Sequence, residues 1–225
     1  MNKAITKTWK RALLVMITCG VYVAPAWAHE INYALENAPV TNVASFYLKL
    51  GFEHIIPLGL DHILFVVCLC LLNNHLKTVL WQATAFTVAH SITLALSIQN
   101  IITLPGAIVE PIIALSILFV AIENLVFDEL KPWRIAIVFV FGLIHGLGFA
   151  SVLNEIGLPR DQFAVSLISF NVGVELGQIL IIALVFAFIY AFQKKAWYKR
   201  WFVYPVSFVI ILIAAYWTVQ RIANV

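Results

Sequence analysis

The chain has 225 residues, of which 63% are hydrophobic and only 11% are charged. A soluble domain of this length keeps a large water-exposed surface, so this composition excludes an ordinary soluble globular protein and indicates a chain that lies in lipid. The formal net charge is only +3, and the basic residues fall between apolar runs instead of forming one patch, which argues against a nucleic-acid partner.

Residues 1–28 have the pattern of a secretory signal peptide. Basic residues in the first 11 positions precede a short apolar run at 12–22, and Ala26-Trp27-Ala28 fits a cleavage site. The alternative is an uncleaved first membrane helix. Cleavage would leave His29 as the first residue, with an amine and an imidazole that could chelate one ion, although an ordinary terminal histidine fits as well.

The rest of the chain is predicted to be a polar periplasmic lead-in at 29–53 and a transmembrane domain at 54–225. Six apolar segments follow the lead-in, each close to the ~20 residues that cross the hydrocarbon layer of a membrane. They lie at 54–72, 76–98, 107–127, 133–153, 163–192 and 201–220. The sequence therefore predicts an all-α fold, a single polytopic bundle of about six transmembrane helices.

The basic residues predict the orientation of these helices. If signal cleavage leaves the new N-terminus outside, the loops on the inner side hold most of the lysines and arginines, as the positive-inside rule requires. The inner residues are Lys77, Lys131, Arg134, Lys194, Lys195, Lys199 and Arg200. We therefore expect a protein of the bacterial inner membrane, with both ends of the mature chain in the periplasm.

Polar residues inside the apolar segments are the most informative, because a charged side chain near the bilayer centre costs ~2.5 kcal/mol or more. The first segment carries His54, Asp61 and His62. A regular helix would place His54 and Asp61 on one face, although Pro57 and Gly59 could bend or unwind it. Asp61 could bind a metal ion directly, or it could orient the imidazole of His62. The sequence leaves both roles open.

Two later segments carry one histidine each. His90 lies in 76–98 on a semi-polar stripe with Thr87, and His145 lies in 133–153 between Gly142 and Gly146. The small glycines would let another helix approach closely, which places His145 toward the interior of the bundle. Each imidazole could be a metal ligand or a proton carrier, or it could simply bond a neighbouring helix.

The candidate glutamates are spread over two further segments. Glu110 and Glu123 lie a rise of roughly 20 Å apart on one helix, so they cannot share a site. Glu110 could join an outer cluster or favour its helix N-terminus, and Glu123 could be an inner gate or an interfacial carboxylate. In 163–192, Asn171, Glu175 and Gln178 form one polar stripe. For Asn171 and Gln178 a ladder of interhelical hydrogen bonds is the alternative.

Several of these residues are expected at a similar depth in the outer half of the bundle. Imidazoles and carboxylates without thiolates suit a borderline divalent cation such as nickel, cobalt or zinc. The predicted metal-site residues are His54, Asp61, His62, His90, Glu110, His145 and Glu175. The secondary candidates are His29, Glu123, Asn171 and Gln178.

The same residues also carry a family likeness. The stretches Gly51 to Leu64, Phe86 to Thr93, Val109 to Ser116, Phe141 to Ala150 and Asn171 to Gln178 resemble the HupE/UreJ family of membrane proteins. That family is associated with nickel or cobalt uptake for hydrogenase and urease assembly, and its mark is a histidine followed by Asp-His in the first helix. The resemblance implies that His54, Asp61 and His62 handle metal.

The spacing of this mark departs from the commoner pattern. Six residues separate His54 from Asp61, where five are usual, which is typical of a divergent branch of the family.

The leading functional hypothesis is a permease for a divalent transition-metal cation, Ni²⁺ or Co²⁺ above all, and not an enzyme. An intramembrane zinc-dependent hydrolase is the rival, because histidines and carboxylates can also hold a catalytic zinc ion. A third hypothesis is a non-catalytic assembly factor that delivers metal or haem to a partner, such as metalloenzyme maturation proteins. The sequence has no nucleotide-binding motif, so a permease would use an ion gradient or the membrane potential.

Overall fold

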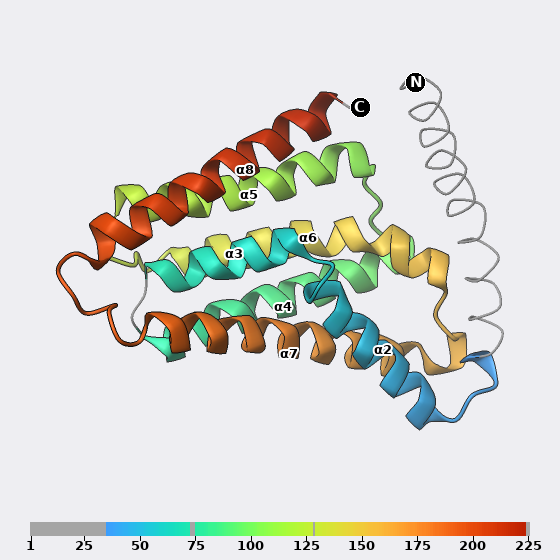
Figure 1. Ribbon diagram of the computed structural model, residues 1–225. Helices are drawn as coiled ribbons and strands as arrows, with labels where there is room; N and C mark the ends of the chain where they lie inside the picture. The colour runs from blue at the N-terminus through green and yellow to red at the C-terminus, as the bar shows by residue number, and fades with distance from the viewer. Residues whose placement is uncertain (1–34, 73–74, 128, 224–225) are drawn as a thin grey trace, which may run out of the picture.

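The computed structural model describes residues 35–72, 75–127 and 129–223, and the predicted signal peptide and His29 lie outside them. The described residues form helices joined by short connections, with no β-strand among them (Figure 1). The helices are α2 (Val40–Ile55), α3 (Leu60–Leu71), α4 (Leu76–Ile98), α5 (Gly106–Val126), α6 (Arg134–Ile156), α7 (Phe163–Ile189) and α8 (Tyr204–Ala223). A 3₁₀ turn, η1 (Arg160–Gln162), precedes α7, and a π-helical turn, η2 (Lys199–Val203), precedes α8.

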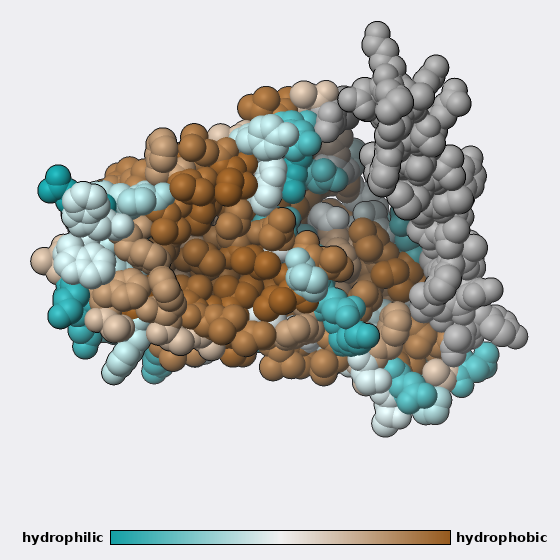
Figure 2. All heavy atoms as spheres, in the orientation of Figure 1, coloured by the Kyte–Doolittle hydropathy of each residue, from teal (hydrophilic) through white to brown (hydrophobic). Residues whose placement is uncertain are grey.

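The predicted all-α membrane bundle is confirmed. Five helices are long and apolar enough to span a membrane, namely α4, α5, α6, α7 and α8, the last two with the turns that precede them. Their bounds agree within a few residues with five of the six segments expected from the sequence. Figure 2 shows a broad hydrophobic band between two ends at which polar residues gather, as lipid contact requires. The chain is therefore a multi-pass membrane protein.

The first predicted span, 54–72, is not one helix. It is occupied by the end of α2 and by α3, and the axes of these two helices differ by 68°. Part of the expected lead-in, Val40 to Glu53, is also helical because it belongs to α2. Pro57 lies in the break, where its ring and missing N–H prevent a continuous helix. His54 and Asp61 therefore do not share the face of one regular helix, as their spacing alone would predict.

Helix α2 packs along α7. Its buried residues Val43, Tyr47, Gly51 and Ile55 recur every four positions and so form one face. A Cβ atom on Gly51 would collide with the backbone of Phe170 in α7. The two backbones thus lie closer together than larger residues would allow.

The bent pair α2–α3 connects the two ends of the bundle. Near the start of the pair, the Tyr47 hydroxyl donates to the carbonyl of Gly157, which follows α6. At its other end, the Tyr198 hydroxyl donates to the Leu71 carbonyl over 3.4 Å, and burial raises the pKa of Tyr198 to about 12, which keeps it a neutral donor. Counted as one span, the pair brings the number of crossings to six.

Helices α4 and α6 form another close pair. Gly142 and Gly146 of α6 lie against the backbone carbonyls of Phe86 and His90 in α4, where an added Cβ atom would clash. The predicted packing role of these glycines is confirmed, and His145, between them, is buried. The remaining large contact joins α5 to α8 along their length.

Candidate metal centre

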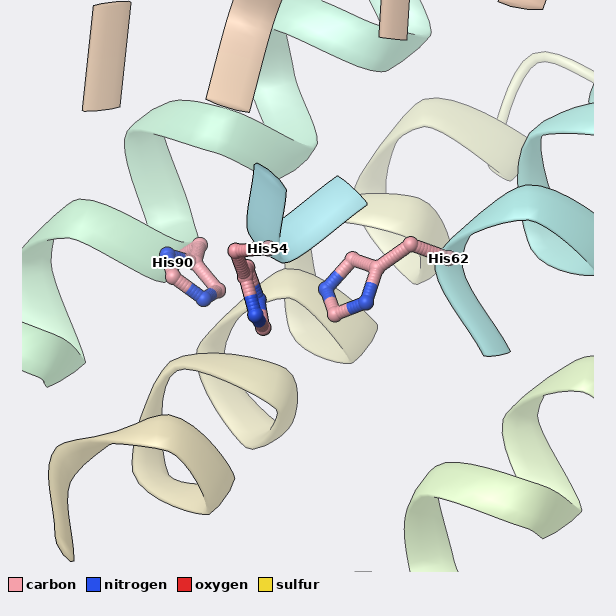
Figure 3. A group of neighbouring side chains, drawn as sticks. All are labelled: His54, His62 and His90. Carbon is pink, nitrogen blue, oxygen red and sulfur yellow. The ribbon is translucent and has the colours of Figure 1, made fainter. Parts of the chain in front are cut away.

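Three histidines from three helices meet inside the bundle. His54 lies at the end of α2, His62 in the first turn of α3 and His90 in the C-terminal half of α4, and their rings turn toward a shared space (Figure 3). Each offers one ring nitrogen such that the three atoms lie within 4.8 Å of one another. The ring centroid of His54 lies 4.7 Å from that of His62 and 6.0 Å from that of His90.

The nitrogens of these rings are buried and available. Within the described part of the chain, Nε2 of His54 and Nε2 of His62 have no hydrogen-bond partner. The ring of His90 has the Asn171 side chain of α7 as a polar neighbour, which leaves at least one of its nitrogens for an ion. His62 is 3% exposed and His90 is fully buried. A buried imidazole normally satisfies its nitrogens, because an unmade hydrogen bond in a dry interior costs ~1–3 kcal/mol. Three such rings side by side form a candidate site for a metal ion.

Asp61 orients one of these rings. Its Oδ1 accepts hydrogen bonds from the backbone N–H of His62 at 2.9 Å and from Nδ1 of the same residue at 3.0 Å. The bond to Nδ1 keeps the proton there and leaves the lone pair of Nε2 free for an ion. Of the two roles that the sequence left open for Asp61, the geometry therefore favours the orienting one.

His145 stands next to the three histidines. Its ring centroid is 5.0 Å from that of His62, and its Nε2 lies 2.9 Å from Oγ of Ser116 in α5. The Ser116 hydroxyl donates its single hydrogen to the carbonyl of Ile113, at 2.7 Å, so it must accept from His145. This places the proton on Nε2 of His145 and leaves Nδ1 as a free acceptor, without a partner among the described residues.

Phenylalanine rings surround the histidines, a feature that the sequence analysis missed. Phe149 lies 3.9 Å from the His54 ring, Phe170 stacks on Phe149 at 5.2 Å, and Phe86 lies 4.9 Å from His145, all measured between centroids. Such a wall excludes water and strengthens electrostatic interactions inside the site. Phe149 follows His145 by one helical turn, a spacing that was available in the sequence.

The three histidines fit a transition-metal ion. Zinc binds imidazole nitrogen at ~2.0–2.1 Å, which puts the nitrogens of a tetrahedral site about 3.4 Å apart. The three nitrogens all lie within 4.8 Å of one another, so small side-chain rotations would suffice to bring them onto one ion. Imidazole suits zinc, copper, iron and nickel, whereas calcium and magnesium prefer oxygen ligands.

Comparison with known proteins identifies the family to which the chain belongs. A family model described as "HupE / UreJ protein" matches residues 30–221, which is most of the chain. The chain belongs to the HupE/UreJ family. The comparisons with curated proteins and with solved structures found no match.

In this HupE/UreJ protein, Glu175 and Gln178 of the polar stripe on α7 pair with threonines of α4, while Asn171 lies beside His90. Glu175 accepts a hydrogen bond from Thr84 of α4 at 2.7 Å, and Gln178 accepts one from Thr87 at 3.3 Å. These bonds make the interhelical ladder that the sequence analysis considered for Gln178. Glu175 is only partly buried and is not a member of the histidine group.

Asn171, the third member of the stripe, is buried and donates to the carbonyl of Leu167 at 2.8 Å. Together with Glu175 it lines a cavity of about 350 Å³ on the α4–α7 face. Thr87 and Ser91, which flank His90 along α4, line the same cavity.

The carboxylates of α5 also lie outside the histidine group. Glu110 is exposed, and its backbone carbonyl accepts from Arg221 at 2.9 Å. Glu123 is buried in an ion pair with Arg134 of α6, with Oε2 and Nε 3.2 Å apart. The sequence analysis assigned Arg134 to an inner loop and missed this partner. The pair explains how Glu123 tolerates burial, since a buried charge needs a countercharge.

Proposed function

We propose that this HupE/UreJ protein is a membrane carrier that binds a divalent transition-metal cation, nickel or cobalt, at His54, His62 and His90. One observation carries the proposal: three buried imidazoles from separate helices converge, with unpaired nitrogens within 4.8 Å of one another. Membership of a family associated with nickel and cobalt handling supports the choice of metal. His145, with its free Nδ1, is the candidate fourth ligand.

The set of ligand atoms also supports a carrier, which releases its ion, over a protein that stores the ion. Neutral imidazoles leave the charge of a divalent ion uncompensated, and the one carboxylate nearby acts through His62. Such a site binds the ion less tightly than one with thiolates or several carboxylates, because it supplies no negative charge directly. A carrier needs an ion that can leave again.

Metal binding by the purified chain tests the proposal. Titration with Ni²⁺, Co²⁺ and Zn²⁺ should give one site per chain, and His90→Ala should weaken binding at least tenfold, in line with the cost of disturbing metal-site residues. His75→Ala is the matched control, because His75 is an exposed histidine before α4 and does not belong to the group of three. Equal affinities for both variants would refute the site.

Transport needs a separate measurement. Vesicles that contain the wild-type chain should accumulate Ni²⁺ or Co²⁺, and vesicles with the His90→Ala chain should not. Binding without flux would contradict the carrier and favour an assembly factor that passes metal to maturation proteins.

A zinc-dependent hydrolase is the second candidate, and the three-histidine set itself favours it. Catalytic zinc is often held by three protein ligands with the fourth position open for water. Such an enzyme would retain its zinc through chelation and show no flux, whereas a carrier would exchange its ion readily.

The proposal includes the orientation expected from the charges. The signal peptide would be removed, the chain would lie in a bacterial inner membrane, and both ends of the mature protein would face the periplasm. The three histidines, which lie in the half of the bundle that α2 lines, would then be closer to the periplasmic surface, from which the ion would enter.

A further inference from the structure

A basic cavity lies at the opposite end of the bundle from α2. Its volume is about 440 Å³, and it is formed by the first turns of α4 and α6 with the connection that precedes α6. Three cationic residues line it: Lys77 of α4, Lys131 of the connection and Arg134 of α6. None of the described residues that line it carries a carboxylate.

The backbone adds to this positive charge. Helices α4 and α6 run in the same direction, and both begin at this cavity, at Leu76 and Arg134. The N-terminus of a helix carries a partial positive charge and N–H groups without helical partners, so two such ends together favour an anion.

The side chain of Arg134 is a second observation, separate from the helix ends, that points to a ligand. Its side chain is 2% exposed, and its ion pair with Glu123 is made through Nε. The Nη1 atom is buried and has no hydrogen-bond partner within the described ranges. A guanidinium normally uses its planar set of donors, and a phosphate oxygen is the acceptor that its geometry matches best.

The surroundings of the cavity point to a lipid as the source of that phosphate. Trp81, which lines the cavity, is 60% exposed, and Ile135 beside it is 43% exposed, so the cavity opens beside surface that contacts lipid tails. A tryptophan at this position is typical of the headgroup region of a membrane. Basic pockets between transmembrane helices on the inner side are known to hold the head groups of anionic lipids.

We propose that this cavity binds the phosphate group of an anionic phospholipid of the inner leaflet. Lys77 and Lys131 contact the phosphate from the exposed side, and Nη1 of Arg134 donates to it from the buried side. The acyl chains lie along the apolar surface at Trp81 and Ile135. This site does not depend on metal binding, since the three histidines lie toward the other end of the bundle.

Native mass spectrometry of the full chain tests the proposal. Delipidated protein in mild detergent is titrated with phosphatidylglycerol, with phosphatidylcholine and with inorganic phosphate. We expect one retained phosphatidylglycerol per chain, with an affinity about tenfold above that for phosphatidylcholine. Lys77→Gln with Lys131→Gln should lower the affinity for phosphatidylglycerol about tenfold, since each basic residue near an anionic surface contributes measurably to binding. Both lysines are exposed, so this variant should fold normally.

Two control variants distinguish binding at this cavity from a general effect of positive charge on lipid affinity. Lys194→Gln with Lys195→Gln removes two exposed lysines after α7, at the same end of the bundle, and should leave the affinity unchanged. Lys77→Arg with Lys131→Arg should also retain it. Equal losses in the two glutamine variants, equal binding of both lipids, or binding of inorganic phosphate without the lipid would each overturn the proposal.

Discussion

The role of Asp61 illustrates how a neighbouring side chain sets the chemistry of a ligand. The sequence allowed Asp61 to bind metal or to orient His62, and in the structure its Oδ1 lies 3.0 Å from Nδ1 of His62. A carboxylate in this position fixes the ring, holds the proton on Nδ1 and makes Nε2 a better donor to an ion. The same residue type would have a different effect one helical turn away.

Asp61→Asn tests this role. The amide oxygen can still accept from Nδ1 of His62 but lacks the charge, so we expect metal affinity to fall about tenfold with the fold intact. His62→Ala, which removes the ligand itself, should cost more. Calorimetric titration with Ni²⁺ measures both, and equally large losses would mean that Asp61 binds the ion directly.

At the scale of helices, close packing of backbones positions the histidines. His90 lies on α4 at the height where Gly146 of α6 meets its carbonyl, and an added Cβ atom at Gly146 would also collide with Oγ1 of Thr93. Backbone atoms cannot move aside as a flexible side chain can, so the contact holds α4, and with it His90, at a fixed distance from α6.

Gly146→Ala should therefore separate α4 from α6. We expect a loss of about 1–3 kcal/mol in stability, the usual cost of overpacking, together with weaker metal binding because His90 shifts. Gly148→Ala is the matched control on the same helix, since its Cβ atom would mainly meet the flexible end of the Ile113 side chain. Thermal unfolding in detergent compares the two variants, and equal melting temperatures would contradict this account.

At the scale of the whole molecule, the bent pair α2–α3 decides the topology. Counted as one span, it gives six crossings and places the start of α2 at the same end of the bundle as the end of α8 (Figure 1).

Reporter fusions test on which side of the membrane α8 begins and ends. Alkaline phosphatase is active only in the periplasm, so a fusion after Val225 should be active and a fusion after Lys195, between α7 and α8, should be inactive. A fluorescent protein that folds only in the cytoplasm should give the reverse pattern at both positions. An inactive phosphatase after Val225 would contradict a periplasmic C-terminus.

The sequence by itself determined the membrane class, the family resemblance and the bounds of five spans, because hydrophobic length and local motifs are properties of consecutive residues. It also identified His54, His62, His90 and His145 as residues that lipid alone would not tolerate. Their depth could be estimated because each residue of a helix adds a constant rise.

Only the tertiary structure decided which of these residues meet. The direction in which the side chains of a helix point depends on how that helix packs against its neighbours. In this protein, glycine contacts such as that of Gly146 with α4 determine the packing. The break at Pro57 folds α2 back so that His54 reaches His62, while the packing of α7 directs Glu175 to Thr84 instead. These contacts join residues far apart in the chain, and no local pattern encodes them.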